Sequence, residues 1–215
     1  MQVGESLVSE DCTERCKCTV EGYVSCGKIS CAPGESCVVQ RGIRTCGRTH
    51  ASCNLLSMGG LTTFDKLMTT LGSSGKYKMI TLCDSSQTRF KVTADLNLAA
   101  PTPMTKAIYF NYEATSIVLK PDLVVLVNGQ QVMLPADIGD ISIRLSQGTV
   151  LIKHSSGIEL KYCSLGNVKV TVSEAYASRL CGLCGNFNGL IPDDLMMRSS
   201  RIATNILAFH TDWKE

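Results

Sequence analysis

The stretch Leu123-Val-Val-Leu-Val-Asn-Gly-Gln-Gln-Val-Met-Leu134 carries the clearest structural signal in this sequence. Two apolar runs, residues 123–127 and 131–134, lie on either side of the dipeptide Asn128-Gly129. Both central residues of a tight hairpin turn need positive φ, which Asn and Gly adopt most readily. The stretch therefore predicts two antiparallel strands joined by a turn at Asn128-Gly129.

Similar runs occur on both sides of this hairpin, and many alternate between apolar and polar residues. They cover residues 77–83, 89–98, 107–112, 116–119, 141–145, 150–153, 158–162 and 168–172. Strands every 8 to 12 residues or so, separated by Gly, Asn, Ser and Pro, are typical of an antiparallel sandwich or barrel. Helix is expected only around residues 174–180 and near the C-terminus. Residues 48–215 are therefore predicted to form an all-β domain, an antiparallel β-sandwich.

Seven of the 12 cysteines lie within residues 12–46: Cys12, Cys16, Cys18, Cys26, Cys31, Cys37 and Cys46. A segment this short cannot bury enough apolar surface to fold alone, so it needs covalent or metal cross-links. Zinc sites recur as Cys-x2-Cys pairs, which this segment lacks, and His50 is its only nearby histidine. Residues 1–47 are therefore predicted to be a small disulfide-rich module, which indicates an extracellular or lumenal setting. The first residues carry no apolar run, so we expect a piece of a longer secreted chain.

Charge and composition exclude several classes of function. The 21 basic and 19 acidic residues give a net charge of +2, without the long basic runs of a nucleic-acid or membrane-surface binder. No apolar stretch approaches the ~18 residues of a membrane span, so no membrane insertion is expected. The three histidines, His50, His154 and His210, lie in no recognisable catalytic motif, and we expect no enzyme activity.

The residues best suited to bind a ligand lie together in one stretch, Cys181-Gly-Leu-Cys184-Gly-Asn186-Phe-Asn188-Gly-Leu-Ile-Pro-Asp193-Asp194. Gly189 and Pro192 force tight turns among side chains that offer oxygen ligands. Calcium takes 6–8 such oxygens, so the loop is a candidate calcium site. The alternative is a hydrogen-bonded turn without metal.

At this point the sequence resembles a known family. Three stretches look like the signatures of von Willebrand factor type D domains. They are residues 181–194, Cys53 together with Thr62-Thr-Phe-Asp65, and the closing Ala208-Phe-His-Thr-Asp-Trp213. The cysteine-rich segment 12–46 resembles the small TILa or E-type module that precedes such domains.

The resemblance implies a ligand set and two disulfides. Its calcium ligands match Asp65, Asn186, Asn188, Asp193 and Asp194, with the Leu190 carbonyl as a sixth. It also implies that Cys53 pairs with Cys184 and Cys83 with Cys181. Cys163 is then left over, as is one cysteine of the first module.

The chain also departs from the family pattern. Residues 57–61 replace a Gly-Asp-Pro-His-Tyr segment, so self-cleavage at an Asp-Pro bond is not expected. Lys66 replaces a glycine after Thr62-Thr-Phe-Asp65, which affects the local turn. A family cysteine near residue 75 is missing.

The function implied is a non-enzymatic structural and interaction module of an extracellular adhesion, mucus or matrix glycoprotein, braced by disulfides and calcium. Its partners would be other modules of the same chain or neighbouring extracellular proteins, with a disulfide-linked multimer of the parent protein as a possibility. The alternative is thiol–disulfide exchange through Cys181 and Cys184. Reactive pairs of this spacing sit at helix N-termini, whereas this pair follows a strand region, which favours structural disulfides.

Overall fold

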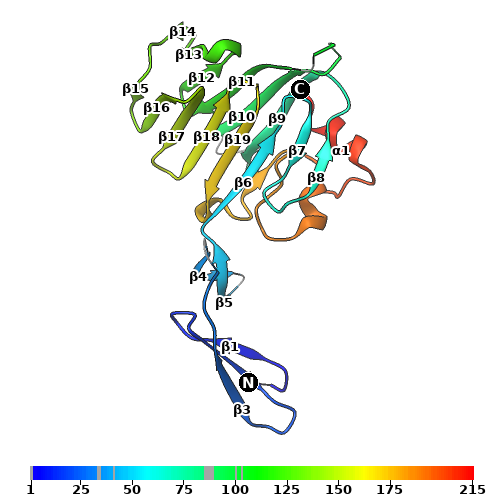
Figure 1. Ribbon diagram of the computed structural model, residues 1–215. Helices are drawn as coiled ribbons and strands as arrows, with labels where there is room; N and C mark the ends of the chain where they lie inside the picture. The colour runs from blue at the N-terminus through cyan, green and yellow to red at the C-terminus, as the bar shows by residue number, and fades with distance from the viewer. Residues whose placement is uncertain (1, 33–34, 41, 85–89, 100, 103) are drawn as a thin grey trace. The chain divides into compact units, whose positions relative to one another are not determined.

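The computed structural model describes residues 2–32, 35–40, 42–84, 90–99, 101–102 and 104–215 (Figure 1). The chain divides into two compact units, residues 1–50 and 51–215. Within the described residues, no helix has both the length and the apolar character needed to cross a membrane.

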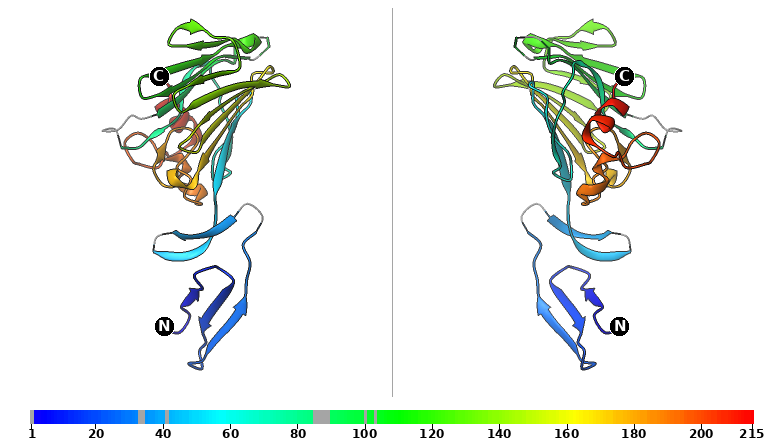
Figure 2. Two further views of the ribbon diagram at one scale, coloured as in Figure 1. Left: turned by 90° about the vertical axis from the view of Figure 1, so that its left-hand side faces the viewer. Right: turned by 90° about the vertical axis from the view of Figure 1, so that its right-hand side faces the viewer.

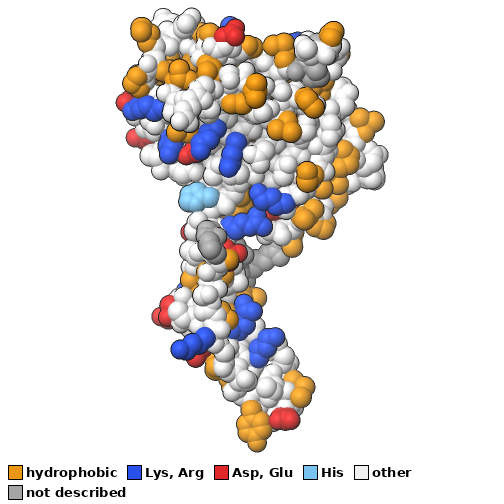
Figure 3. Space-filling model, viewed as in Figure 1, with side chains coloured by type: hydrophobic (Ala, Val, Ile, Leu, Met, Phe, Trp, Pro, Cys, Tyr) orange, Lys and Arg blue, Asp and Glu red, His pale blue; other side chains and the backbone are white. Residues whose placement is uncertain are grey.

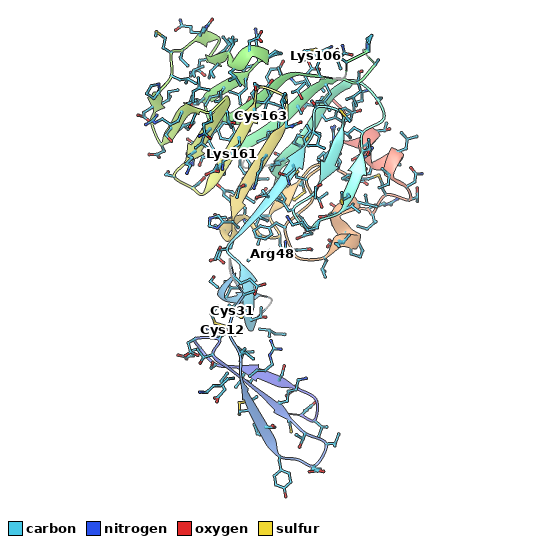
Figure 4. All side chains as sticks on the ribbon, viewed as in Figure 1. Cys12, Cys31, Arg48, Lys106, Lys161 and Cys163 are labelled. Atoms are coloured by element: carbon cyan, nitrogen blue, oxygen red, sulfur yellow. A yellow bond between two sulfur atoms is a disulfide. The ribbon has the colours of Figure 1, made fainter. Side chains whose placement is uncertain are left out.

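The first unit is a set of short strands held together by sulfur. It contains the three-stranded sheet β1 (Ser6–Val8), β2 (Glu14–Cys18) and β3 (Val24–Lys28), and the hairpin of β4 (Glu35–Gln40) and β5 (Ile43–Arg48). Its disulfides are Cys12–Cys37, Cys16–Cys26 and Cys31–Cys46 (Cys12 and Cys31 are labelled in Figure 4). Among its described hydrophobic side chains only Cys12 is fully buried, so apolar burial contributes little. The prediction of a disulfide-rich module is confirmed.

The second unit is a sandwich of two sheets, seen in two views in Figure 2. One sheet has the order β14 (Gln130–Gln131), β13 (Val125–Val127), β12 (Thr115–Leu119), β11 (Met104–Tyr112), β10 (Phe90–Asn97), β9 (Gly75–Leu82) and β20 (Leu180–Cys181). The other has the order β15 (Ala136–Ile138), β16 (Ile141–Ser146), β17 (Thr149–His154), β18 (Ile158–Cys163), β19 (Val168–Ser173), β6 (His50–Leu55), β7 (Gly60–Thr62) and β8 (Met68–Thr70). The all-β prediction is confirmed.

Alternation along the strands places the core between the sheets. In β18, Ile158, Leu160 and Tyr162 are buried, whereas Glu159 and Lys161 point outward. Buried side chains from both sheets form one cluster. Burial of apolar surface stabilises a fold by about 25 cal/mol per Å², so this cluster makes the main stabilising contribution to the unit.

The hairpin predicted at Asn128-Gly129 is present between β13 and β14. Asn128 has φ 48° and Gly129 has φ 84°, so both central residues adopt the positive φ that the turn requires. The flanking strands are shorter than predicted. Residues 132–134 are not in a strand, and the 3-10 helix η1 (Pro121–Leu123) takes up the start of the 123–127 run.

Two other predictions agree with the structure only in part. The helix expected at residues 174–180 is wrong beyond its first turn, since η2 (Glu174–Tyr176) is followed by a turn and Leu180 belongs to β20. Pairing of β20 with β9 buries Leu180, which outweighs local helix preference. The strand predicted for 89–98 is present from Phe90, while residue 89 lies outside the described residues.

The C-terminal helix α1 (Ile206–Asp212) is confirmed, and it fastens the end of the chain to β9. The Asn205 side chain caps it by accepting from the Ala208 N–H at 2.8 Å. Phe209 and Trp213 are buried in the core cluster. The Lys78 N–H donates to the Trp213 carbonyl at 2.9 Å, so the tail runs beside β9.

Candidate metal centre

The stretch of residues 181–194, here called the motif loop, begins in β20 and ends in the 3-10 helix η3 (Ile191–Leu195). Its backbone is fastened along β9. The N–H groups of Leu183 and Cys184 donate to the carbonyls of Lys78 and Met79 at 3.2 and 3.0 Å. The loop is therefore held by main-chain bonds before any side chain is considered.

Two disulfides tie the motif loop to the rest of the sandwich. Cys184 is bonded to Cys53 in β6, and Cys181 is bonded to Cys83 just after β9. These are the two pairings that the family resemblance implies. Neither Cys181 nor Cys184 is a thiol in this structure. Within the described part of the chain, the free cysteines are Cys18 and Cys163, both half-buried.

Glycine is required at two positions of the loop because other groups approach the backbone closely. A methyl group on Gly182 would clash with the carbonyl oxygen of Met79. A methyl group on Gly185, which has φ +77°, would lie within bonding range of the Asp194 carboxylate. The Cys-Gly-Leu-Cys-Gly pattern thus lets the loop close on β9 and lets Asp194 lie against Gly185.

Asp65 joins the start of the sandwich to the motif loop. It follows β7 and is buried, with 4% of its surface exposed. Its two carboxylate oxygens accept from the backbone N–H groups of Asn188 and Gly189, each at 2.9 Å. The Asn188 amide in turn donates to Asp193 at 2.6 Å and accepts from the Leu190 N–H. Residues separated by more than 120 positions therefore meet in one hydrogen-bonded cluster.

Asp194 is the most deeply buried carboxylate of the loop, at 1% exposure. One of its oxygens accepts a short hydrogen bond from the Thr63 hydroxyl. Burial raises the pKa of Asp194 to about 7, helped by the charges of Asp65 and Asp193 and opposed by hydrogen bonds from Thr63 and the Asn186 backbone. Without a cation, the site therefore resists carrying its full negative charge.

Several buried oxygens of the loop have no hydrogen-bond partner among the described residues. They are one side-chain oxygen each of Asn186, Asp193 and Asp194. A cavity of about 10 Å³, lined in part by these three residues, adjoins them, with room for one water-sized group. None of the ion pairs between described residues involves Asp65, Asp193 or Asp194. Buried unpaired acceptors are costly, so the cluster has the chemistry of a cation site.

The donor set fits calcium, which prefers carboxylate, amide and carbonyl oxygens. The structure brings Asp65, Asn188, Asp193 and Asp194 together, and Asn186 lies on the shared cavity. Leu190 lies at the N-cap of η3 with 44% of its surface exposed. Among the described residues, the three carboxylates do not form a group whose ligand atoms all lie within 4.8 Å.

Sequence reasoning did not identify Thr63. Its hydroxyl donates to Asp194 and accepts from the Leu67 N–H at 2.9 Å, so it orients a proposed ligand. Its place two residues before Asp65 in Thr-Thr-Phe-Asp was the available signal. Lys66, which replaces the family glycine, keeps the turn by adopting φ 79°.

Of the histidines considered for catalysis, His154 makes the most specific contacts. Its ring stacks on Tyr112 with centroids 3.8 Å apart. Its Nδ1 atom accepts from the Ser156 N–H at 3.0 Å, so this nitrogen carries no proton. Burial lowers the pKa of His154, against the opposing charges of Asp140 and Glu113. The arrangement stabilises the turn between β17 and β18.

Comparison with known proteins agrees with this geometry. Residues 53–201 match the von Willebrand factor type D domain, and residues 1–47 match the TILa domain. The chain is 32% identical to human IgGFc-binding protein over 195 residues, covering 88% of this chain and 4% of that protein. It is 28% identical to human alpha-tectorin, covering 96% of this chain and 10% of that protein. It is also 28% identical to pig zonadhesin, covering 99% of this chain and 9% of that protein.

The chain thus spans a tenth or less of each of these relatives. Its five disulfide bonds and its relatives place it in an extracellular setting. A sandwich closed by Cys53–Cys184 and Cys83–Cys181, with the motif loop held against Asp65, agrees with the match over residues 53–201. The chain therefore belongs to the von Willebrand factor type D domain family, and a TILa domain within the same chain precedes its type D domain.

Proposed function

We propose that this chain is a non-enzymatic structural and interaction module of an extracellular adhesion, mucus or matrix protein, and that calcium braces it. The observation that carries the calcium part is the set of buried oxygens of Asn186, Asp193 and Asp194 that have no hydrogen-bond partner among the described residues. A divalent cation supplies the missing positive charge and coordinates such oxygens directly.

Asp65, Asn186, Asn188, Asp193 and Asp194 would hold the ion. Asp65 follows β7, and the other four lie in the motif loop. Calcium would therefore cross-link the same parts of the sandwich that Cys53–Cys184 joins. The result would be a stiff module that presents its surface loops to other modules of the parent chain or to neighbouring extracellular proteins.

The thiol-exchange alternative has no supporting observation in this structure. Cys181 and Cys184 are each bonded to a different cysteine, and Cys184 is fully buried. Exchange needs an accessible thiolate. We therefore retain the structural role for both.

Calcium-dependent thermal unfolding tests the proposal. The melting temperature of chelated protein should rise on addition of millimolar calcium, because a ligand that binds only the folded state stabilises it. At a calcium concentration about 100 times Kd, the gain is about 2.7 kcal/mol. Asp65→Asn and Asp194→Asn should each remove most of this gain.

Glu174→Gln is the matched control, since it neutralises an exposed acidic residue of the same unit in η2. It should keep the full response to calcium. Identical melting curves of the unmodified protein in calcium and in chelator would overturn the calcium assignment. An equal response in all three variants would show that the ion binds elsewhere.

A further inference from the structure

The chain contains two Asn-Gly dipeptides, Asn128-Gly129 and Asn188-Gly189. This dipeptide is chemically labile, because a glycine leaves its own nitrogen sterically free to attack the asparagine side chain. The glycine nitrogen forms a bond to the side-chain carbonyl carbon, and the amide leaves as ammonia with the proton of the attacking N–H. Water then opens the resulting succinimide ring at either carbonyl, which gives aspartate or isoaspartate.

The ring closes only when the asparagine side chain and the glycine nitrogen can move toward each other. A dipeptide held in a folded turn therefore reacts through locally opened states of the chain. The free energy of such opening ranges from almost nothing at exposed tips to the full unfolding free energy in a core. The two dipeptides of this chain have the same chemistry and lie in opposite surroundings.

Asn188-Gly189 is held at both reacting groups. The Gly189 N–H, which contains the attacking nitrogen, donates to the buried Asp65 carboxylate at 2.9 Å. The Asn188 N–H donates to the other oxygen of the same carboxylate at 2.9 Å. The Asn188 side chain donates to Asp193 at 2.6 Å and accepts from the Leu190 N–H at 2.8 Å. Neither the nucleophile nor the amide can move without breaking these bonds.

The motif loop around Asn188 is also costly to open. Cys181 and Cys184 tie it to two other segments through disulfides. Leu183 and Phe187 are buried in the core cluster of the second unit. Freeing this dipeptide therefore disrupts the core itself, and its opening free energy approaches that of unfolding the unit.

Asn128-Gly129 is held much less. It forms the turn between β13 and β14, and both residues are exposed. The Gly129 N–H has no hydrogen bond to any described residue, and no described atom beyond its chain neighbours lies within 4 Å of the position of a Gly129 side chain. The Asn128 side chain makes one hydrogen bond, in which its oxygen accepts from the Ser116 N–H at 2.9 Å.

The hairpin that carries this turn is small and lies at the edge of its sheet. β14 pairs with β13 through two residue pairs, Leu126 with Gln131 and Val127 with Gln130. The hairpin lies at one end of the second unit, where the face seen in Figure 3 shows mostly uncharged side chains. Both residues of β14 are exposed. Opening therefore breaks few bonds and exposes little apolar surface.

We propose that Asn128 is a site of spontaneous deamidation, with water as the co-reactant, and that Asp65 and the fold around it shield Asn188 from the same reaction. The turn then gains a negative charge with age, while the motif loop keeps its amide. This inference goes beyond the proposed function and does not depend on calcium, since the hydrogen bonds that shield Asn188 are made without an ion.

The two products at residue 128 differ in their effect on the turn. Aspartate tolerates the positive φ of this position and still accepts from the Ser116 N–H, so it keeps the hairpin. Isoaspartate adds a methylene group to the backbone. The turn is then too long for the pairing of β14 with β13, and the hairpin opens.

The test compares both dipeptides in one molecule. The full chain with its disulfides intact is incubated in chelator at physiological pH and temperature, and deamidation of each peptide is followed by mass spectrometry as a gain of one mass unit. Chromatography separates the isoaspartate from the aspartate form. The reduced and alkylated chain in denaturant gives the rate of each dipeptide without structure, and the ratio of the two rates is its protection factor.

The protection factor of Asn188 should exceed that of Asn128 by about tenfold or more. A smaller difference, or stronger protection of Asn128, would overturn the proposal. No modification of Asn128 in the folded chain, over a time in which half of it reacts in the unfolded chain, would overturn the site itself.

Asp65→Ala tests the shield, because it removes both acceptors of the Asn188 and Gly189 N–H groups. Deamidation of Asn188 should then accelerate about tenfold or more, with the rate at Asn128 unchanged. Glu174→Gln is the matched control, since it removes an exposed negative charge of the same unit, and it should alter neither rate. An unchanged rate at Asn188 in folded Asp65→Ala would overturn the role of Asp65. The comparison in the unmodified chain needs no variant, so it decides the proposal even where Asp65→Ala does not fold.

Discussion

Replacement of Gly185 by alanine tests the packing of the motif loop most directly. Gly185 has φ +77°, and a methyl group there would meet the Asp194 carboxylate, with its central carbon only 2.6 Å away. An alanine in this left-handed backbone conformation lowers the free energy of unfolding by about 1–2 kcal/mol. Displacement of Asp194 also breaks its hydrogen bond from Thr63, which costs about 1.5–3 kcal/mol for a charged acceptor. The variant should therefore lose about 2.5–5 kcal/mol of unfolding free energy.

Gly189→Ala in the same loop provides the control. Gly189 has a nearly identical φ of +83°, but no described atom lies within 4 Å of the position its methyl group would take. Only the backbone cost of about 1–2 kcal/mol should then apply. The backbone N–H that donates to Asp65 is kept in this variant.

Urea unfolding in chelator measures both variants, with unchanged m-values as the check on two-state comparison. Gly185→Ala should be less stable than Gly189→Ala by about 1.5–3 kcal/mol. It should also lose the proposed calcium response, whereas Gly189→Ala should retain it. Equal destabilisation of the two variants would refute the close approach of Asp194 to Gly185.

Three further predictions concern the rest of the sandwich. The double variant C53A/C184A should lose about 5 kcal/mol of stability by the chain-entropy relation, because the bond spans 131 residues; a loss under 1 kcal/mol in denaturant unfolding would contradict this. Thr63→Val should cost about 2–4 kcal/mol and reduce the calcium response, since it removes the donor to Asp194; an unchanged response in thermal unfolding would show that Thr63 does not orient that ligand. The pKa of His154 is lowered on folding, so its contribution to stability is complete above its unfolded value of about 6.5 and is lost as pH falls through its folded value. Between pH 7.5 and pH 5, the unfolding free energy should therefore fall more for the unmodified protein than for His154→Gln. Equal decreases in the two proteins would exclude this contribution of His154.

Local patterns predicted much of the fold because they depend on neighbouring residues. Asn128-Gly129 specified its turn through the positive φ of both residues. The density of cysteines in residues 12–46 indicated covalent stabilisation, because so short a segment buries almost nothing. The helix expected at residues 174–180 failed where tertiary pairing intervened. Leu180 is buried by joining β9, a contact that no local propensity records.

Long-range contacts determine the candidate metal site. The motif signature indicated Asn186, Asn188, Asp193 and Asp194 as a cluster, but only the folded chain shows Thr63 donating to Asp194 from 131 residues away.

The amino-acid sequence by itself determined the all-β class, the cysteine-rich first unit and the oxygen-rich loop, since each follows from the spacing of nearby residues. The tertiary structure alone decided which buried oxygens of the described residues remain unpaired. Strand pairing and disulfides bring together residues more than 100 positions apart, and both desolvation and electrostatic fields depend on that three-dimensional proximity.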